Sequence, residues 1–341
     1  MPIASGDAVP ACSEQSGEKA VKMPNRSVTI LIPCYNEQEV LTELFSRLDQ
    51  LITHTEQQSY SLNCLFVDDG SSDDTQSMIK DYSTKKSYVD YIFLSRNFGK
   101  EKAMFAGIEH IQADATVIID ADLQDPPELI PQMISLWEQG YDDVYAKRRS
   151  RSGESWLKRT SSHLYYRILQ SVSEVSIQKD TGDFRLLDKK CIQALKMLKE
   201  SERNSKALFS WIGYKKIEFL FDRDERKAGK TKWNYPQLMH LAVDGLTSFT
   251  TKPLHFATYT GIIISLCAFL YALLTLIRTL FVGIQVPGYA SILIAILLLG
   301  GLNLLCIGVV GEYLGRVFLQ TKQRPNYLIQ EKHFNSSIKI N

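Results

Sequence analysis

Short apolar runs and amphipathic stretches alternate through the first half of the chain. Continuous apolar runs are typical of strands buried on both faces, and apolar residues at helical spacing indicate amphipathic helices. We therefore predict strands at Val28–Pro33, Leu65–Asp69, Tyr91–Leu94, Ala115–Asp120 and Asp142–Ala146. Helices are predicted at Gln38–Leu51, from the "GSSDDT" turn to about Tyr82, at Lys100–Ile111, and from about Pro126 onward. This alternation predicts an α/β layer around a parallel sheet.

Polar, turn-rich segments follow four of these strands. They read "PCYNE", "DDGSSDDT", "SRNFGKE" and "DADLQDPP". Open α/β sheets bind ligands beyond the carboxyl ends of their strands, so we expect these segments to build the functional site. The G-x-G-x-x-G turn of dinucleotide-binding folds is missing, which argues against an NAD site.

Two long uncharged runs dominate the later part of the chain, Phe256–Ile277 and Ala290–Val310. Each is long enough for a helix that spans a bilayer, which takes about 20 residues. A pair of buried core helices is the alternative. The connection between the runs is short and contains Pro287 and Gly288, so we predict a two-span hairpin over residues 253–311.

Positive residues flank this hairpin, with Lys252 before it and Arg316, Lys322 and Arg324 after it, whereas the connection between the two runs contains only Arg278. Positive residues favour the cytoplasmic side. We therefore expect a protein of the cell membrane whose catalytic domain and two termini are cytoplasmic.

Two amphipathic segments precede the hairpin. Lys147–Arg167 is rich in Lys and Arg, with apolar residues interleaved at roughly helical spacing. It is either a solvated basic face or an interfacial helix near anionic lipid headgroups, and the neighbouring spans favour the second. Tyr235–Phe249 has one apolar face and leads directly into the first span. We predict that it lies along the membrane surface.

Composition narrows the class of protein. The chain has 341 residues and a formal net charge of +1, so no global field suggests nucleic acid. Its six cysteines show no C-x-x-C spacing, which fits reduced thiols and no zinc site. The polar start of the chain lacks the apolar region of a signal peptide and is expected to be disordered. The predicted organisation is a disordered tail (1–25), a cytoplasmic catalytic domain (26–234), a juxtamembrane helix (235–252), the hairpin (253–311) and a cytoplasmic C-terminal segment (312–341).

Clustered acids end the fourth predicted strand, in "VIIDADLQDPPE". Alternate side chains of a strand point the same way. If the extended backbone continues, Asp120, Asp122 and Gln124 share one side and form an oxygen set suited to Mg²⁺ or Mn²⁺. Asp125 directly precedes Pro126 and is expected to cap the next helix.

Six motifs occur in order: "IPCYNE", "VDDGSSDDT", "LSRNFGKE", "DADLQDPPE", "TGDFRLLD" and "RKAGKTKW". Over about Val28–Tyr327 the chain resembles the family-2 glycosyltransferases that act on polyisoprenyl phosphate, the type of dolichol-phosphate mannose synthase and bactoprenol glucosyltransferase. The resemblance implies a GT-A fold, a nucleotide-sugar donor, a divalent metal and a lipid-phosphate acceptor. Where the usual family motif R-x-x-G-x-S-K-Y has Ser and Tyr, this chain has Thr231 and Trp233. These residues keep a hydroxyl group and an aromatic ring. The Q-x-x-R-W motif of processive synthases is absent.

The resemblance also implies roles for single residues. The donor site would contain Pro33, Tyr35, Glu37, Asp69 and Lys100, and also Asp68, unless Asp68 only caps the "GSSDDT" turn. Asp183 and Arg185 would form the reaction centre, with Asp183 as the base. A phosphate monoester is already largely anionic at neutral pH, so Asp183 could instead orient the acceptor or complete the donor site, or merely form a structural ion pair with Arg185. Candidates for binding phosphate are Arg148, Arg185, Arg226 and Lys232, with an exposed charge as the alternative for Arg148.

We therefore expect a membrane-anchored, inverting glycosyltransferase that moves one sugar onto polyprenyl phosphate at the cytoplasmic face. UDP-glucose is the first choice of donor, with UDP-GlcNAc and GDP-mannose as alternatives. Expected partners are the bilayer, a flippase, a later glycosyltransferase and further copies of the chain. The rival hypotheses are a transferase that glycosylates a lipid or glycan hydroxyl, and a catalytically silent membrane scaffold.

Overall fold

All five predicted strands form, and helices follow them as expected. The computed structural model describes residues 26–55, 60–148, 181–198, 205–221, 252–282 and 288–335. The first strands are β1 (Arg26–Cys34), β2 (Tyr60–Asp68), β3 (Val89–Leu94), β4 (Ala115–Ile118) and β5 (Asp143–Arg148). The helices between them are α1 (Gln38–Thr55), α2 (Thr75–Lys85), α3 (Lys100–His110) and α4 (Ile130–Glu138). Four predicted features lie outside the described residues: the N-terminal tail, most of the basic segment, the Tyr235–Phe249 helix, and Arg226 with Lys232.

One sheet of eight strands organises the domain, in the order β7-β5-β6-β4-β1-β2-β3-β8. Its pairing adds β6 (Thr181–Asp188), β7 (Lys216–Phe221) and β8 (Ile329–His333) to the predicted strands. β6 pairs antiparallel with both β4 and β5, and β8 pairs antiparallel with β3. The other pairings are parallel. The sheet is therefore mostly parallel, as predicted, with two reversed strands that the prediction lacked.

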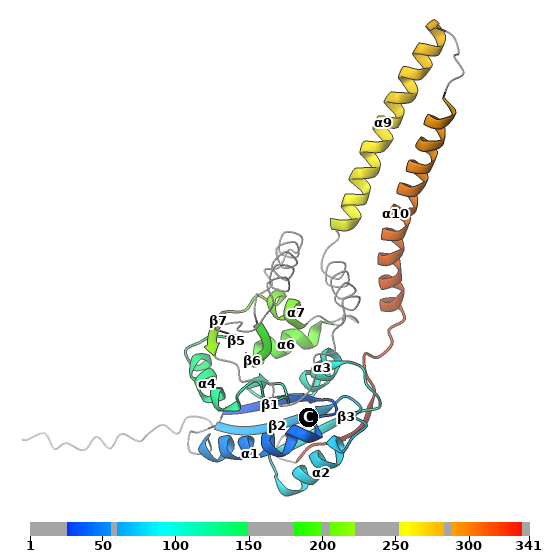
Figure 1. Ribbon diagram of the computed structural model, residues 1–341. Helices are drawn as coiled ribbons and strands as arrows, with labels where there is room; N and C mark the ends of the chain where they lie inside the picture. The colour runs from blue at the N-terminus through cyan, green and yellow to red at the C-terminus, as the bar shows by residue number, and fades with distance from the viewer. Residues whose placement is uncertain are drawn as a thin grey trace, which may run out of the picture.

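Helices cover both faces of the sheet, which explains the continuous apolar strands (Figure 1). Apolar residues of α1, α2 and α4 pack on one face in a core that contains Ile30 and Ile32. On the other face, apolar residues of α3, α6 (Lys189–Met197) and α7 (Ser205–Trp211) pack around Leu31, which lies between Ile30 and Ile32 in β1 and points the opposite way. Gly107 lets α3 pack closely, because a Cβ there would lie 2.2 Å from Leu31 Cδ1. The result is a three-layer α/β/α domain.

The strand order reverses beside β1. The chain builds β1, β2 and β3 outward in one direction and then places β4 on the opposite side of β1. The loops after β1 and β4 therefore diverge and leave a crevice at the carboxyl ends of these two strands, the usual ligand site of open α/β sheets.

The start of α4 differs from the prediction. A 3₁₀ turn, η2 (Pro127–Leu129), precedes α4, and Pro126 occupies its N-cap position without a side-chain cap hydrogen bond. The prediction that Asp125 caps this helix is therefore wrong. With Pro126 and Pro127 adjacent, the first turn begins one residue later than the Asp-Pro pattern suggests.

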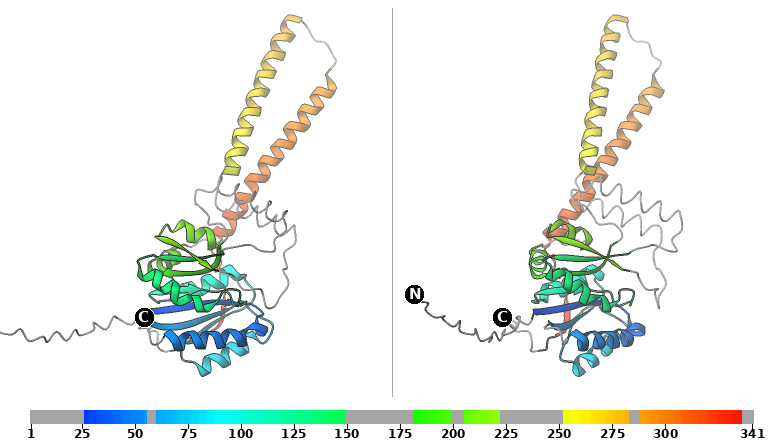
Figure 2. Two further views of the ribbon diagram at one scale, coloured as in Figure 1. Left: turned by 60° about the vertical axis from the view of Figure 1, so that its left-hand side comes forward. Right: turned by 90° about the vertical axis from the view of Figure 1, so that its left-hand side faces the viewer.

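Two long helices, α9 (Lys252–Val282) and α10 (Tyr289–Thr321), project side by side away from the sheet (Figures 1 and 2). Large apolar side chains along them are exposed, including Phe269, Leu274 and Leu304. In the described part of the chain, one segment, Leu298–Thr321, is long and apolar enough to cross a bilayer, and Ala257–Tyr271 is a shorter apolar stretch. The two-span hairpin therefore stays a prediction. α10 also runs ten residues beyond the predicted end at Gly311, to Thr321.

After α10 the chain returns to the catalytic domain. β8 pairs with β3, and Ser95 N–H donates a 2.9 Å hydrogen bond to the carbonyl of Leu328. Glu331 accepts hydrogen bonds from Lys80 at 2.7 Å and from Tyr91 at 2.9 Å. Part of the predicted C-terminal segment is therefore the edge strand of the catalytic sheet.

Candidate active site

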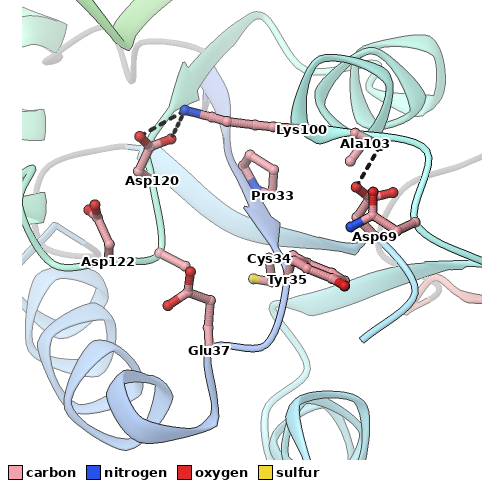
Figure 3. Close-up of a pocket in the computed structure, with 12 residues that line it drawn as sticks. Pro33, Cys34, Tyr35, Glu37, Asp69, Lys100, Ala103, Asp120 and Asp122 are labelled. Atoms are coloured by element: carbon pink, nitrogen blue, oxygen red, sulfur yellow. Dashed lines mark hydrogen bonds and ion pairs between the residues drawn. The ribbon is translucent and has the colours of Figure 1, made fainter. Parts of the chain in front are cut away.

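A pocket of about 430 Å³ lies at the carboxyl ends of β1 and β4 (Figure 3). Four segments of the chain contribute to it, the same four that follow the predicted strands. Its lining consists of Pro33, Cys34, Tyr35, Glu37, Asp69, Asn97, Gly99, Lys100, Ala103, Asp120, Ala121 and Asp122. Five of the six predicted donor-site residues are among them, together with two of the three predicted metal ligands.

Reciprocal hydrogen bonds join the loops after β1 and β2. Asn36 N–H donates to Ser71 Oγ at 2.8 Å, and Asn36 Oδ1 accepts from Ser72 N–H at 2.9 Å. Glu37 N–H donates to Thr75 Oγ1 at 2.9 Å. Asn36 has a φ of +55°, a region that Asn tolerates better than most residues. This network holds Tyr35 and Glu37 at the pocket before any ligand arrives.

Asp68 and Asp69 have different tasks. Asp68 is fully buried and accepts hydrogen bonds from the backbone and hydroxyl of Ser71 and from the Gln76 amide. Asp68 therefore caps the turn, the alternative reading of this residue, and it is not among the pocket residues. Asp69 lines the pocket and accepts N–H groups of Phe98 at 2.7 Å and Gly99 at 2.8 Å. Burial raises the pKa of Asp69 although these two bonds oppose the shift.

Gly70 allows this contact. Its φ is +69°, and a Cβ at this position would lie 2.4 Å from the backbone carbon of Arg96. The turn after β2 therefore approaches the loop before α3 more closely than any side chain permits, and Asp69 reaches the N–H groups of that loop.

The acidic loop turns earlier than predicted. β4 ends at Ile118, Leu123 has a φ of +60°, and Asp122 Oδ1 accepts Gln124 N–H at 3.1 Å. The extended backbone on which the predicted alternation rested therefore stops before Asp122, and Gln124 is not among the pocket residues. Asp120 and Asp122 both reach the pocket through the turn, so two of the three predicted metal ligands come together.

The reversed strand β6 brings Asp183 to the same place. β4 and β6 pair Ile118 with Arg185, so continuing the register by two residues sets Asp120 opposite Asp183. Lys100 Nζ lies between them, 2.7 Å from Asp120 Oδ1 and 2.6 Å from Asp183 Oδ2. Figure 3 shows this lysine reaching Asp120 from the first turn of α3. Lys100 thus links the predicted metal site to the predicted reaction centre.

Negative charge exceeds positive charge in this cluster. Burial alone would lower the pKa of Lys100, but the carboxylates of Asp120 and Asp183 raise it well above its ordinary value. Burial raises the pKa of Asp120, with the charges of Asp183 and Asp122 acting in the same direction against Lys100. The pKa of Glu101 rises to about 6, first through burial and then through the charge of Asp183. Among the described residues of this cluster, one ammonium group therefore lies near four carboxyl groups, a field that attracts a further cation.

The donor set fits a hard divalent cation. Asp120 Oδ1 is buried and accepts no hydrogen bond in the described structure, where its contact with Lys100 is an ion pair. The described residues contain no group of three or more His, Cys, Asp or Glu side chains arranged to hold a metal. Mg²⁺ usually takes only one or two protein carboxylates and completes its shell with water and phosphate. Asp120 and Asp122 could therefore hold Mg²⁺ or Mn²⁺ together with a diphosphate.

Arg185 does not form the predicted pair with Asp183. Its side chain is 1% exposed, 3.3 Å from Asp143 Oδ2, with the guanidinium 4.0 Å from the ring centroid of Phe209. Arg185 lies two residues further into the strand than Asp183, beneath α7, so it cannot reach the pocket edge. Arg185 is therefore not among the pocket residues, and its predicted roles in the reaction centre and in phosphate binding stay predictions that this buried position does not favour. Arg148 is the last residue of β5, at the end of the sheet where Asp120 follows β4.

Two residues near Asp183 were missed at the sequence level. Ser205 is fully buried and begins α7, and its hydroxyl lies 3.4 Å from Asp183 Oδ1. Glu101 accepts both the N–H and the hydroxyl of Ser205, each at 3.0 Å. "KE" at a helix start and "SERNSKAL" carry no signal of such a contact, because the two segments meet only through tertiary packing.

Among the described residues that line the pocket, none supplies a thiolate nucleophile. Cys34 lines it, but burial and the nearby carboxylates of Asp68 and Glu37 raise the pKa of its thiol well above the ordinary value. The thiol stays protonated at neutral pH, which disfavours a covalent enzyme intermediate at this position.

Known glycosyltransferases are similar to this protein over nearly the whole chain. Residues 29–196 match the sequence profile of "Glycosyl transferase family 2". An uncharacterized glycosyltransferase of Synechocystis sp. is 46% identical over 304 residues, covering 89% of this chain and 95% of that protein. The bactoprenol glucosyl transferase of Shigella phage SfII is 39% identical over 306 residues, covering 90% and 98%. Among solved structures, glucosyl-3-phosphoglycerate synthase from Mycobacterium tuberculosis, in complex with Mn²⁺, UDP and glucosyl-3-phosphoglycerate, has a TM-score of 0.47 and 14% identity over 71% of this chain and 86% of that chain.

Proposed function

The chain belongs to glycosyl transferase family 2 and is a glycosyltransferase with a GT-A fold, and we propose that it transfers one glucose from UDP-glucose to a polyprenyl phosphate. The observation that carries this proposal is the Lys100 bridge. It joins a carboxylate suited to the donor's metal, Asp120, to a carboxylate at the neighbouring strand end, Asp183. A transferase needs this proximity, because the leaving group and the attacking group act on the same anomeric carbon.

The donor occupies the pocket between β1 and β4. Pro33, Tyr35, Glu37 and Asp69 surround the base and ribose, and Tyr35 is 43% exposed, so its ring is accessible for stacking. Asp120 and Asp122 hold the metal with the diphosphate. When bound, this metal would stabilise the negative charge of the departing nucleotide.

The acceptor approaches from the side of Asp183. An oxygen of the phosphate forms a bond to the anomeric carbon as the bond to the nucleotide breaks, with inversion at that carbon. The second pKa of a phosphate monoester is about 6, so the acceptor needs little deprotonation at neutral pH. Asp183 therefore acts mainly by orienting the acceptor and Lys100. Arg148, Arg226 and Lys232 are proposed to bind the phosphate groups.

The long helices support the proposal that this site lies at a membrane surface. Their exposed apolar side chains suit lipid, and we keep the two-span hairpin, with the catalytic domain and both termini on the cytoplasmic side. The similarity to a bactoprenol glucosyl transferase supports a lipid-phosphate acceptor and glucose. A product made on the cytoplasmic face would need a flippase before a later glycosyltransferase could use it, and the enzyme is proposed to form homo-oligomers.

The test is a donor panel with the purified full chain. UDP-glucose, UDP-GlcNAc and GDP-mannose, each radiolabelled, are incubated with Mg²⁺ or Mn²⁺ and undecaprenyl phosphate. We expect label in an acid-labile lipid with UDP-glucose, loss of transfer with EDTA, and a loss of at least about 100-fold in Asp122→Asn. Asp114→Asn is the matched control, because Asp114 precedes β4 and binds Ser27 at the opposite end of the strand from the pocket.

The alternatives give different results. Transfer only to an acceptor with a hydroxyl group would mean that this acceptor, and not polyprenyl phosphate, is the substrate. No transfer from any donor would favour the silent scaffold. Full activity of Asp122→Asn at low Mg²⁺ would overturn the metal assignment alone.

A further inference from the structure

Asp183 is contacted at both of its carboxylate oxygens, by Lys100 of α3 and by Ser205 of α7. Lys100 Nζ contacts Oδ2 directly at 2.6 Å. The Ser205 hydroxyl lies 3.0 Å from Glu101 Oε1 and 3.4 Å from Asp183 Oδ1, and its single proton is donated to one of these two carboxylates at a time. Lys100, Glu101 and Ser205 together are called the Asp183 clamp.

We propose that Glu101 and Ser205 are positioning residues for sugar transfer, acting through Asp183. The inference rests on the proposed role of Asp183 and adds two residues to it. Both oxygens of an unclamped carboxylate can rotate about the side-chain bond. When the Ser205 hydroxyl donates to Oδ1 while Lys100 contacts Oδ2, the carboxylate is held in one orientation toward the pocket.

The clamp also fixes the position of α7. Ser205 N–H donates to Glu101 Oε2 at 3.0 Å, so the carboxylate that orients the Ser205 hydroxyl also accepts an N–H at the start of this helix. α7 in turn carries Phe209, which lies against Arg185. A purely structural role for Ser205 and Glu101, in capping α7, is therefore the competing explanation.

The Ser205→Ala variant separates the two explanations. It keeps the backbone N–H that donates to Glu101 and removes only the hydroxyl that reaches Asp183. We expect kcat to fall about tenfold, the size of a hydrogen bond to a charged group, with UDP-glucose affinity unchanged by calorimetry. Ser210→Ala is the matched control on the same helix, because the Ser210 hydroxyl has no hydrogen-bond partner in the described structure. It should retain wild-type kcat.

Glu101 provides a second, independent variant. Glu101→Ala removes the acceptor of the Ser205 N–H, which holds Ser205 beside Asp183, and should also lower kcat about tenfold. Glu101→Gln keeps an oxygen for the Ser205 N–H and an amide for its hydroxyl, so it should remain within about threefold of wild type.

A double-mutant cycle with Asp183→Asn decides whether these effects pass through Asp183. We expect Ser205→Ala to lower kcat no further when Asp183→Asn is already present. A tenfold loss in both backgrounds would overturn the inference and leave a structural role. Full activity of Ser205→Ala beside an impaired Asp183→Asn would overturn it too, without affecting the proposed function. Full activity of Asp183→Asn would overturn the proposed role of Asp183 and this inference with it.

Discussion

Asp68 and Asp69 are adjacent, but the tight turn after β2 directs their carboxylates to different groups. Asp68 receives hydrogen bonds within its own turn, whereas Asp69 crosses to the loop before α3. Gly70 makes the crossing possible, because its positive φ and missing Cβ allow backbone to touch backbone. The donor pocket therefore depends on a residue that has no side chain.

Gly70→Ala should destabilise the fold and weaken donor binding together. Gly140→Ala is the matched control, since Gly140 also has a positive φ, +90°, but has no atom within 4 Å of an added Cβ. The control should lose only the left-handed backbone cost of about 1–2 kcal/mol. Gly70→Ala should lose more, and its UDP-glucose affinity should fall at least about tenfold. Urea unfolding and calorimetry measure the two effects, and equal losses of stability with intact donor binding in both variants would contradict the close-contact argument.

Glu101 should make stability depend on pH in an unusual direction. Its folded pKa of about 6 lies above the ordinary value of 4.5, so the folded state binds the proton more tightly. The resulting stabilisation is present below about pH 4.5 and is lost as the pH rises through 6. At neutral pH, Glu101→Gln should therefore raise the free energy of unfolding by up to about 2 kcal/mol, since one pKa unit corresponds to about 1.4 kcal/mol.

Urea unfolding of both proteins between pH 4.5 and 7.5 tests this sign. The difference between them should grow as the pH rises. A constant difference over the range would mean that Glu101 does not titrate there.

Two reversed strands change what the sheet does. β6 enters antiparallel to β4, so its first residues lie at the carboxyl end of β4, where Asp183 faces Asp120. β8 closes the other edge on β3, next to the loop that runs from Ser95 into the pocket. An otherwise parallel sheet thus receives one residue of the proposed reaction centre, Asp183, and a covered β3 edge from strands that run the opposite way.

Removing β8 should expose the edge of β3. Deletion of residues 328–341 removes the β3 pairing and the contacts of Glu331 and Asn335. We expect a loss of about 2–4 kcal/mol, from several hydrogen bonds at about 1 kcal/mol each, and faster hydrogen exchange in β3. Deletion of only residues 336–341 keeps β8 and serves as the control. Unchanged exchange in β3 after the longer deletion would show that β8 does not stabilise this edge.

At the scale of the whole molecule, the chain leaves the catalytic domain and returns to it. α9 and α10 extend away from the sheet, and the segment after them rejoins it as β8 (Figures 1 and 2). The end of α10 is therefore tied to the domain through the pairing of β8 with β3. Such a connection suits an enzyme whose donor is soluble and whose acceptor headgroup lies at a bilayer surface.

The two helices should supply proximity and not chemistry. Replacing residues 252–321 by a flexible linker keeps β8, which a simple C-terminal truncation would remove. We expect unchanged UDP-glucose affinity and retained transfer to a water-soluble, short-chain prenyl phosphate. Transfer to undecaprenyl phosphate in vesicles should fall on the order of 100-fold. Full activity on the vesicle acceptor would refute the anchoring role.

Patterns local to the chain determined much of this protein. Continuous apolar runs predicted five strands, because strands covered on both faces must be apolar throughout. Apolar residues at helical spacing predicted four helices. The turn chemistry placed the site at the strand ends, and "DADLQDPPE" with its companion motifs indicated a family-2 glycosyltransferase before the comparisons confirmed that family. The uncharged runs predicted a two-span transmembrane hairpin over residues 253–311; two long helices form there, and the membrane spans stay a prediction.

Only the tertiary structure decided which charges meet. Asp183 pairs with Lys100, 83 positions away in the sequence, and Arg185 pairs with Asp143 beneath α7. The sequence motif suggested that Asp183 and Arg185 act together, because they are two residues apart. Strand direction and depth under a helix separate them, and neither property is encoded in local spacing. The reversed β6, the returning β8 and the Glu101–Ser205 contact have the same origin, since each depends on long-range packing that no short stretch of residues specifies.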